Sequence, residues 1–372
     1  MKKWLLFMAT SLVIGAAGAQ SHYLITGTYT GGLSKGIYVY SFDSNTGKTD
    51  SISMVEASNP SFITLSPDQK YAFVVHENGK DGKGGTVSSY AFNKSLGQLT
   101  LINTQSTEGD YPCYVEIDKS GRWLFVANYG TGNFTSYPVS DTGSIGDPKE
   151  TIKHVGTGGN PERQEGPHVH STNISPDNKN LYVADLGIDK IMLYDFNAAD
   201  GSIKPSPAVS AESRPGSGPR HIAYHPNNKW LYLMEEISGT VTAYEFKADK
   251  FRELQRISSV EKNAKGEAGS ADIHVSADGK FLYASNRGDF NNIVIYQIDG
   301  NKGTLKQAGF QPVLGKGPRN FSIDPSGKFL LVANQGSDEV VVFSRNEKTG
   351  LLTDSGQRIL VGKPVCLKWA TK

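Results

Sequence analysis

The chain has 372 residues and a formal net charge of +1, so it lacks the basic excess that indicates a nucleic-acid partner. Its 41 glycines and 17 prolines suit a protein with many turns. The only two cysteines, Cys113 and Cys366, do not have the spacing of metal ligands and do not require a disulfide. We therefore expect no nucleic-acid partner, no metal and no cofactor.

The N-terminus has the pattern of a secretory signal peptide. Two lysines precede an apolar stretch at 5–17, and the small residues Ala-Gly-Ala follow at 17–19. The apolar stretch is short for a transmembrane helix, and no later stretch is long and apolar enough. The pattern predicts a signal peptide over 1–19, cleaved after Ala19, and export to the periplasm or the medium without a transmembrane segment.

The rest of the chain repeats one frame about every 50 residues. The frame is a short apolar strand, a polar turn of the Pro-Asp-Gly-Lys type, and a second strand, and a third and a fourth strand follow it. The strands are rich in Val, Ile, Tyr, Phe and Thr. The copies begin at 60–77, 112–129, 169–186, 219–236, 270–287 and 318–335, with a truncated seventh at 364–372.

Four strands at this period are typical of a propeller blade. The truncated seventh copy lacks three strands, and the segments 22–30, 36–42 and 48–56 near the N-terminus can supply them. The sequence therefore predicts an all-β fold, a seven-bladed β-propeller with four-stranded antiparallel blades. Strands from both ends of the chain would close the last blade, which leaves no open sheet edge. We expect a single domain over 20–372.

Two positions of the frame vary in chemistry from copy to copy. We call them the first slot, just after the start of the first strand, and the second slot, at the end of the second strand. The first slot holds Ser61, Cys113, His170, Arg220, Ala271, Arg319 and Val365; the second holds Glu77, Tyr129, Leu186, Glu236, Arg287 and Gln335. In a propeller the first strand lines the central channel and the second runs antiparallel to it. Both slots are therefore expected at one mouth of the channel.

The residue types in these slots indicate chemistry on an anionic or ester-like substrate. Guanidinium groups bind carboxylates, phosphates and oxyanions, and a nearby Glu or His can move a proton. No serine of the two slots lies in a G-x-S-x-G motif and no Cys lies beside a His in the frame, so water activated by a base fits better than a covalent nucleophile. The alternative is a wet channel lined by structural salt bridges.

Other histidines favour structural interpretations. His225 lies in a turn, where we expect a surface role, and His168 with His170 is weak evidence for a metal site because no third ligand is evident. Asp272 and His274 are two residues apart, and we expect a hydrogen bond that joins neighbouring blades.

Four long stretches resemble a known family. They are "PERQEGPHVHSTNISPDNKNLYVADLGIDKIMLYDF", "GSGPRHIAYHPNNKWLYLMEEISGTVTAYEF", "ADIHVSADGKFLYASNRG" and "GPRNFSIDPSGKFLLVANQGSD". In this order they resemble the lactonase family of seven-bladed propellers, which includes the bacterial propeller-type 6-phosphogluconolactonase and the fungal carboxymuconate-lactonizing enzyme. The resemblance covers essentially 21–370.

The resemblance implies that four slot residues face one another as catalytic residues: His170, Arg220, Glu236 and Arg287. We add Arg319, Glu77 and Tyr129 as candidate substrate-binding residues. The chain departs from the family in two ways. It reads Glu235-Glu236-Ile237 where relatives tend to read Asn-Glu-Leu, and its signal peptide would separate it from phosphorylated sugar lactones, which are cytosolic.

These observations favour a hydrolase of a sugar-derived or other anionic lactone. Arg220 and Arg287 would bind the anionic end of the substrate and its carbonyl oxygen, and Glu236 or His170 would be the base. Two alternatives stay open. The protein could be a muconate cycloisomerase that closes a lactone, or a non-catalytic propeller that binds a ligand or a protein.

Overall fold

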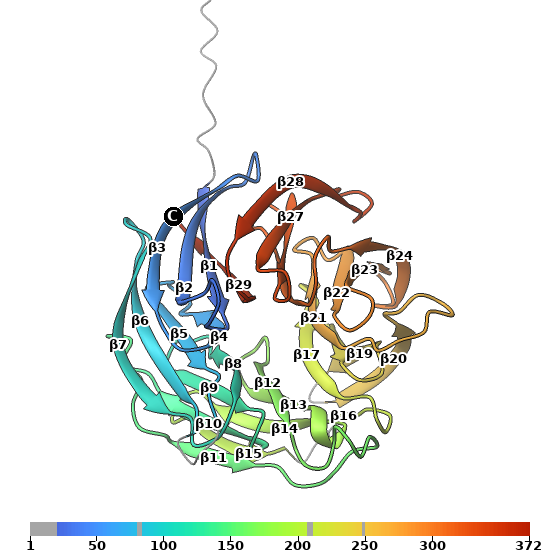
Figure 1. Ribbon diagram of the computed structural model, residues 1–372. Helices are drawn as coiled ribbons and strands as arrows, with labels where there is room; N and C mark the ends of the chain where they lie inside the picture. Colours follow the sequence, from blue (N-terminus) through green and yellow to red (C-terminus); the bar gives the residue numbers. More distant parts are fainter. Residues whose placement is uncertain (1–20, 80–83, 207–210, 248–249) are drawn as a thin grey trace, which may run out of the picture.

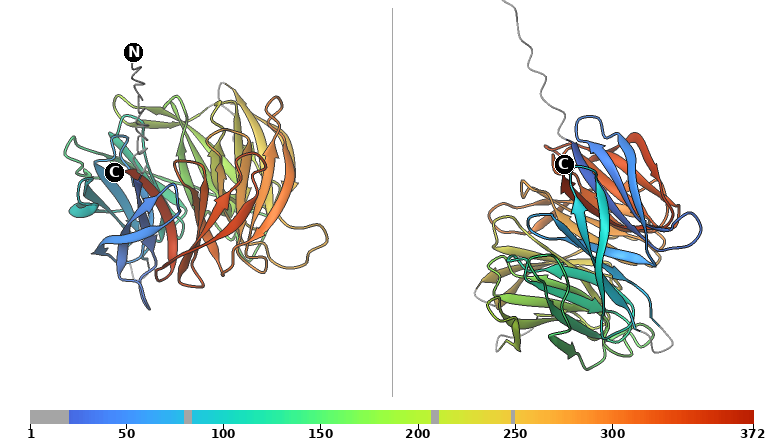
Figure 2. Two further views of the ribbon diagram at one scale, coloured as in Figure 1. Left: turned by 90° about the horizontal axis from the view of Figure 1, so that it is seen from above. Right: turned by 90° about the vertical axis from the view of Figure 1, so that its left-hand side faces the viewer.

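The computed structural model describes residues 21–79, 84–206, 211–247 and 250–372. The predicted signal peptide lies outside these residues. Seven antiparallel sheets surround a central axis (Figure 1), and two further views show the sheets side by side around the ring (Figure 2). The all-β seven-bladed propeller that the repeats predict is confirmed.

The blades follow one another in chain order, and each begins with its innermost strand. The first three comprise β4 (Pro60–Leu65), β5 (Tyr71–His76), β6 (Thr86–Asn93) and β7 (Gln98–Ser106); β8 (Pro112–Ile117), β9 (Trp123–Asn128), β10 (Asn133–Pro138) and β11 (Glu150–Lys153); and β12 (Val169–Ile174), β13 (Asn180–Asp185), β14 (Lys190–Asn197), β15 (Ser202–Pro205) and β16 (Ala211–Glu212). The next three comprise β17 (Pro219–Tyr224), β18 (Trp230–Glu235), β19 (Thr240–Lys247) and β20 (Lys250–Ser258); β21 (Ser270–Val275), β22 (Phe281–Asn286), β23 (Asn292–Ile298) and β24 (Leu305–Pro312); and β25 (Pro318–Ile323), β26 (Phe329–Asn334), β27 (Glu339–Arg345) and β28 (Leu352–Leu360).

The third blade differs from the predicted four strands. Both β15 and the two-residue β16 pair with β14, so two short strands share the outer position of this sheet. A three-residue 3₁₀ turn, η1 (Leu186–Ile188), links β13 to β14. No helix in the described ranges is long and apolar enough to cross a membrane.

Both ends of the chain form the seventh blade, as predicted. Its order is β29 (Pro364–Thr371), β1 (Ser21–Thr28), β2 (Gly36–Asp43) and β3 (Thr49–Glu56). The innermost β29 lies between β25 and β4, so the ring of innermost strands is closed. The blades approach closely at Gly27, where a Cβ atom would lie 2.5 Å from the carbonyl oxygen of Pro60.

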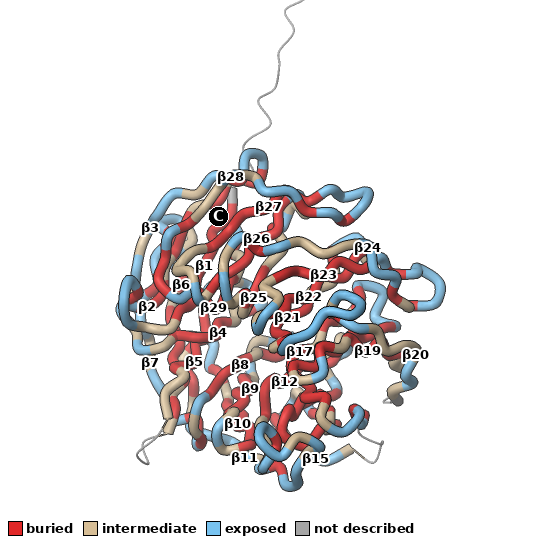
Figure 3. The backbone as a smooth tube through the Cα atoms, turned by 45° about the vertical axis from the view of Figure 1, so that its right-hand side comes forward, coloured by how far each residue is buried: buried red, intermediate tan, exposed pale blue. Residues whose placement is uncertain are grey.

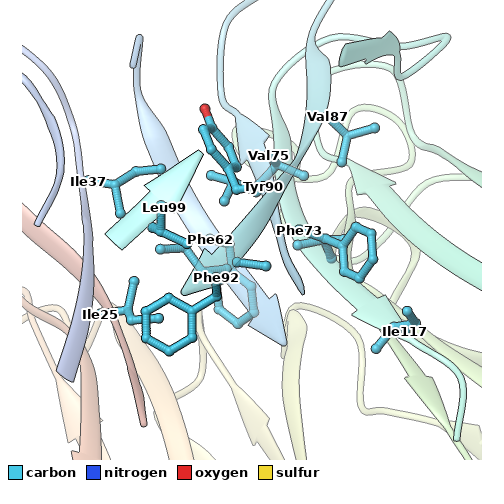
Figure 4. Close-up of a cluster of buried hydrophobic side chains, with 14 of the residues drawn as sticks. Ile25, Ile37, Phe62, Phe73, Val75, Val87, Tyr90, Phe92, Leu99 and Ile117 are labelled. Carbon is cyan, nitrogen blue, oxygen red and sulfur yellow. The ribbon is translucent and has the colours of Figure 1, made fainter. Parts of the chain in front are cut away.

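Apolar side chains between neighbouring blades form the core. Figure 4 shows one such cluster, in which Ile25 and Ile37 of the seventh blade pack with Phe62 and Phe73 of the first, and Ile117 of the second lies on the other side. The second strands are almost wholly buried, whereas outer strands such as β3 and β11 alternate between half-buried and exposed residues (Figure 3). Apolar contacts between neighbouring blades therefore hold the ring together. The packing does not depend on the axial region, where polar side chains can lie.

A β-bulge opens the innermost strand of all seven blades. In β17, Pro219 pairs with Glu235 and His221 pairs with Met234, so Arg220 is an extra residue between two ladder pairs. The same shift occurs at the start of β4, β8, β12, β21, β25 and β29. The bulge includes the first-slot residue in each case. A bulge re-aims side chains, and here the consecutive Arg220 and His221 contact each other inside the channel.

Candidate active site

The first-slot residues gather around the axis of the ring. A small cavity of about 10 Å³ is lined by five of them together with Phe62, His221 and Asn320; the five are Ser61, Cys113, Arg220, Arg319 and Val365. His170 lies beside this cavity, because its ring centroid is 5.3 Å from that of His221 and its Nδ1 is 3.8 Å from Sγ of Cys113. The side chains that the repeat alignment groups are thus close in space.

The second strands end one residue earlier than predicted, so the second-slot residues directly follow the strands instead of ending them. β18 ends at Glu235, and Glu236 follows it; likewise β22 ends at Asn286, before Arg287. The backbone still extends the ladder by one hydrogen bond, because the N–H of Glu236 donates to the carbonyl oxygen of Gly218 at 2.7 Å. This bond fixes the backbone of Glu236 where the loop enters the channel mouth.

Glu236 forms ion pairs with three guanidinium groups. Its Oε2 lies 2.9 Å from Nε of Arg220 and 2.9 Å from Nη2 of Arg287, and its Oε1 lies 2.8 Å from Nη2 of Arg163. Burial raises the pKa of this carboxyl group, but the charges of Arg287 and Arg220 and the bond from Arg163 outweigh burial and hold the pKa well below its usual range. Glu236 is therefore ionised at neutral pH.

A second ion pair lies across the mouth. Nη2 of Arg319 is 3.7 Å from Oε1 of Glu77, and the hydroxyl group of Tyr29 donates to Oε2 of Glu77 at 2.7 Å. The guanidinium of Arg319 lies 5.4 Å from the centroid of the Tyr29 ring. Four guanidinium groups in these two clusters face two carboxylates, which leaves two positive charges in excess (four minus two).

His170 is buried beside aromatic rings. Its ring centroid lies 5.6 Å from that of Tyr129 and 5.3 Å from that of His221. Burial, followed by the charges of Arg220 and His221, holds the pKa of His170 well below its ordinary value. The imidazole is therefore neutral at neutral pH and keeps a lone pair that can accept a proton.

Cys113 corrects one expectation from the sequence. No cysteine is beside a histidine in the frame, yet Sγ of Cys113 lies 3.8 Å from Nδ1 of His170 because their blades are neighbours. Burial and the charge of Glu77 raise the pKa of this thiol far above its ordinary value, so it stays protonated and is a poor nucleophile. Cys113 and Cys366 are both free and buried.

The repeat alignment missed Arg163, which lies in the loop between β11 and β12. Its side chain is 45% exposed, and besides Glu236 its Nη2 lies 3.5 Å from the hydroxyl oxygen of Tyr129. The neighbouring Gln164 ties the loop down, because its Nε2 donates to the carbonyl oxygen of Leu186 and to Oδ1 of Asp189, each at 2.7 Å. Arg163 lies outside the repeated frame, so comparing the copies cannot identify it.

The extra carboxylate at 235 does not enter the mouth cluster. Glu235 is fully buried and accepts from Nη1 and Nη2 of Arg256, the former at 3.0 Å. Two further second-slot residues, Tyr129 and Gln335, lie beside the clusters. Tyr129 stacks on His168 with ring centroids 4.5 Å apart, and Gln335 lines a cavity next to Tyr29.

Two open cavities adjoin the clusters. One of about 730 Å³ is lined by Arg163, Glu236 and Ile237 among others, and one of about 720 Å³ is lined by Tyr29, Asn59 and Gln335 among others. Both fall within the usual size range of small-molecule sites. Arg163 and Glu236 of the first cluster and Tyr29 of the second can therefore contact a ligand of the size of a sugar ring.

Comparisons with known proteins agree with this architecture. A family model described as lactonase, 7-bladed beta-propeller, matches residues 23–369. A Formosa agariphila protein named 6-phosphogluconolactonase is 39% identical over 339 residues, 90% of this chain and 96% of that protein. A Bacillus subtilis protein of the same name is 34% identical over 346 residues, 92% of this chain and 97% of that one.

A solved structure extends the comparison to three dimensions. The Pseudomonas aeruginosa periplasmic gluconolactonase superimposes with a TM-score of 0.91 at 36% sequence identity, covering 94% of this chain and 99% of the other. Sequence and structure thus point the same way over nearly the whole chain. The protein belongs to the lactonase family of seven-bladed β-propellers.

Proposed function

We propose that the channel mouth hydrolyses the ring ester of a sugar-derived or other anionic lactone. The observation that carries this proposal is the ionised Glu236 shared by Arg163, Arg220 and Arg287, in a mouth with two positive charges in excess. Fixed guanidinium groups stabilise an oxyanion more than they stabilise a neutral carbonyl oxygen, so they lower the barrier to attack. The family relationship supports the same type of reaction.

In this reaction a water oxygen attacks the carbonyl carbon and the bond from that carbon to the ring oxygen breaks. One proton of the water reaches the ring oxygen, and the product is the open hydroxy acid. Arg220 and Arg287 hold the developing oxyanion and the anionic end of the substrate. Arg319, Glu77 and Tyr129 bind the rest of the substrate.

Of the two candidate bases, His170 fits better than Glu236. Both oxygens of Glu236 are occupied by guanidinium groups, Oε1 by Arg163 and Oε2 by Arg220 and Arg287, so the carboxylate is poorly placed to take a proton from water. His170 is neutral and keeps an unprotonated nitrogen. We therefore assign the base to His170, which takes the proton from water and returns it to the ring oxygen, and assign to Glu236 the orientation of the guanidinium groups.

Export of the protein is part of the proposal. It rests on the pattern at 1–19 and on the similarity to a periplasmic gluconolactonase. Exported protein would meet unphosphorylated sugar lactones rather than phosphorylated ones. N-terminal sequencing of the protein from fractionated cells tests this part, with Gln20 expected as the first residue; a cytosolic protein that starts at Met1 would contradict it.

The test of the activity is a panel of lactones followed by proton release at constant pH. Glucono-δ-lactone, its 6-phosphate and a muconolactone are compared with the unaided hydrolysis of each, because δ-lactones open on their own. We expect catalysed opening of at least one sugar lactone and a large loss of kcat in His170→Asn. Turnover of the muconolactone alone would support the cycloisomerase, and no turnover of any compound would support a binding protein.

A further inference from the structure

Behind Arg220, a buried histidine and a buried aspartate form a hydrogen-bonded pair. Nδ1 of His221 lies 2.8 Å from Oδ1 of Asp272, and Nε2 of His221 lies 3.3 Å from Nη1 of Arg220. Arg220 and His221 come from β17, and Asp272 comes from β21 of the next blade. The chain Glu236–Arg220–His221–Asp272 therefore runs from the mouth into the channel.

The partners of His221 fix the position of its proton. A guanidinium group can only donate, so Nε2 of His221 must accept from Arg220. The proton then lies on Nδ1, where it donates to the carboxylate of Asp272. Burial and the charge of Arg220 lower the pKa of His221 to about 4, although Asp272 acts in the opposite direction, so the ring carries only this one proton at neutral pH.

Asp272 is itself held by a set of donors from three blades. Its Oδ2 accepts from Nε2 of His274 at 2.8 Å, from the backbone N–H of Phe321 at 3.3 Å and from Nδ2 of Asn320. Its own backbone N–H donates to Oγ of Ser285 at 3.0 Å. Asp272 and His274 bond to each other within β21, whereas the expected bonds between neighbouring blades run from Asp272 to His221 and to Asn320.

The bonds to Arg220 leave one edge of its guanidinium group for a substrate. Nε donates to Glu236, and Nη1 donates to the carbonyl oxygen of Ala271 at 2.6 Å and contacts His221. Among the described residues these partners occupy Nε and Nη1, so Nη2 is the group that can meet a substrate oxygen. The plane of the guanidinium, and hence the direction of Nη2, depends on the acceptors on Nη1.

We propose that His221 and Asp272 are positioning residues of the lactone-opening reaction. Asp272 holds the Nδ1–H tautomer of His221, and the free Nε2 of His221 holds Arg220 in the plane that aims Nη2 at the oxyanion. The proposal rests on the proposed function, because it assigns Arg220 the task of stabilising that oxyanion.

Asp272→Asn tests the proposal with the change of a single atom. The Oδ2 side faces three donors, so the carbonyl oxygen of the new amide takes that place and its NH₂ group faces His221. That NH₂ donates to Nδ1, which moves the ring proton to Nε2, where it meets the N–H of Arg220. We expect kcat to fall by about 10- to 100-fold with a smaller change in KM, the usual effect of losing an outer hydrogen-bond partner. A kcat equal to that of the wild type overturns the proposal.

Two substitutions of His221 distinguish the role of its Nε2 from the role of its Nδ1. A glutamine places a polar atom near the position of Nε2, and its carbonyl oxygen can accept from Arg220, whereas an asparagine reaches only the position of Nδ1. We expect His221→Gln to keep most of the activity and His221→Asn to lose as much as Asp272→Asn. Equal losses in both variants would indicate a packing role and overturn the proposal. His225→Gln is the matched control, because His225 bonds to Gly279 in a distant turn and should leave kcat unchanged.

A spectroscopic readout separates this proposal from the proposed function. ¹⁵N NMR of the histidine rings, with His221 assigned through the His221→Gln variant, should show the Nδ1–H tautomer in the wild type and the Nε2–H tautomer in Asp272→Asn. An inactive wild type with this tautomer change would refute the proposed function and keep the hydrogen-bond assignment. An active wild type whose His221 tautomer does not respond to Asp272→Asn would refute the positioning role alone.

Discussion

At the scale of single residues, the candidate site depends on one carboxylate that three cations share. Glu236 is only 8% exposed in its side chain and Arg220 only 1%, so their charges are taken from water and stabilise each other. Such a pair adds little net stability, but removal of one partner leaves the other charge buried without compensation. Buried charge is acceptable here because each group has several partners.

Replacement of Glu236 by glutamine should therefore affect both stability and rate. Without the carboxylate, Arg220 and Arg287 repel each other and lose their common orientation. We expect the free energy of unfolding in urea to fall by about 3–5 kcal/mol and kcat/KM to fall by roughly 10²-fold or more. Wild-type turnover in this variant would remove Glu236 from the site.

Glu235→Gln is the matched control for this experiment. Glu235 is the adjacent residue and is also a buried carboxylate, but its partner is Arg256 and it does not join the mouth cluster. Glu235→Gln should lower the stability by a similar amount and keep kcat near the wild-type value. Equal losses of kcat in both variants would mean that the Glu236 effect is only structural.

At the scale of elements, strands and loops contribute to the mouth in different ways. The innermost strands carry the first slot on a β-bulge, so their side chains are placed by the sheet ladder. Arg163 is placed by a loop that Gln164 ties to Leu186 and Asp189. The bulge position repeats from blade to blade, whereas the position of Arg163 depends on one loop between β11 and β12.

This difference explains how much the sequence could predict. The repeat period predicted the blades, the closure by both chain ends, and the two slots, because each depends on residues that recur in register. It did not predict the bulge, since a residue inserted into a ladder leaves no mark in an apolar pattern. It also did not predict the contacts of Arg163 or of Cys113 with His170, which depend on a loop path and on the packing of neighbouring blades.

Replacement of Arg163 by glutamine tests the role of the loop. Because the side chain is 45% exposed, its ion pair with Glu236 adds little to stability, about 1 kcal/mol or less. Its charge faces the open cavity, so we expect KM to rise by about 10-fold, the effect of one lost hydrogen bond to a charged group, with a smaller change in kcat. Arg252→Gln, which removes an exposed ion pair with Glu245, should change neither parameter. An unchanged KM in Arg163→Gln would contradict a binding role.

At the scale of the whole molecule, stability depends on the contact between the first and the seventh blade. Gly27 lies at this contact, and a methyl group there would meet the carbonyl oxygen of Pro60 at 2.5 Å and Cβ of Cys366 at 3.2 Å. We expect Gly27→Ala to lower the free energy of unfolding by about 1–3 kcal/mol, as overpacking does elsewhere. Gly300→Ala, where a Cβ atom meets nothing within 4 Å, is the control in the same urea titration. Equal urea midpoints for the two variants would contradict this prediction, because they would show that the blades accommodate the added methyl group at position 27 without loss of stability.

The stability of the ring should also fall on mild acidification. Burial lowers the pKa values of His76 and His170, and burial with the charge of Arg220 lowers that of His221 to about 4 from an ordinary 6.5. At a pH between the folded and the unfolded pKa, the histidines of the unfolded chain bind protons that those of the folded protein do not. The free energy of unfolding therefore decreases as the pH falls from about 6.5 towards 4. For His221 alone the loss is on the order of 3 kcal/mol. Urea midpoints measured across this range test the prediction, and a constant midpoint would contradict it.

The pairing of β1 with β29 has a consequence for the order of events in the cell. Synthesis delivers β1 before all the other strands of the ring and β29 after them, so the ring cannot close until β29 has been made. During that time the six complete blades form at most an open arc with two bare ends. Before that point there is no closed ring to be opened, which is compatible with the export proposed above.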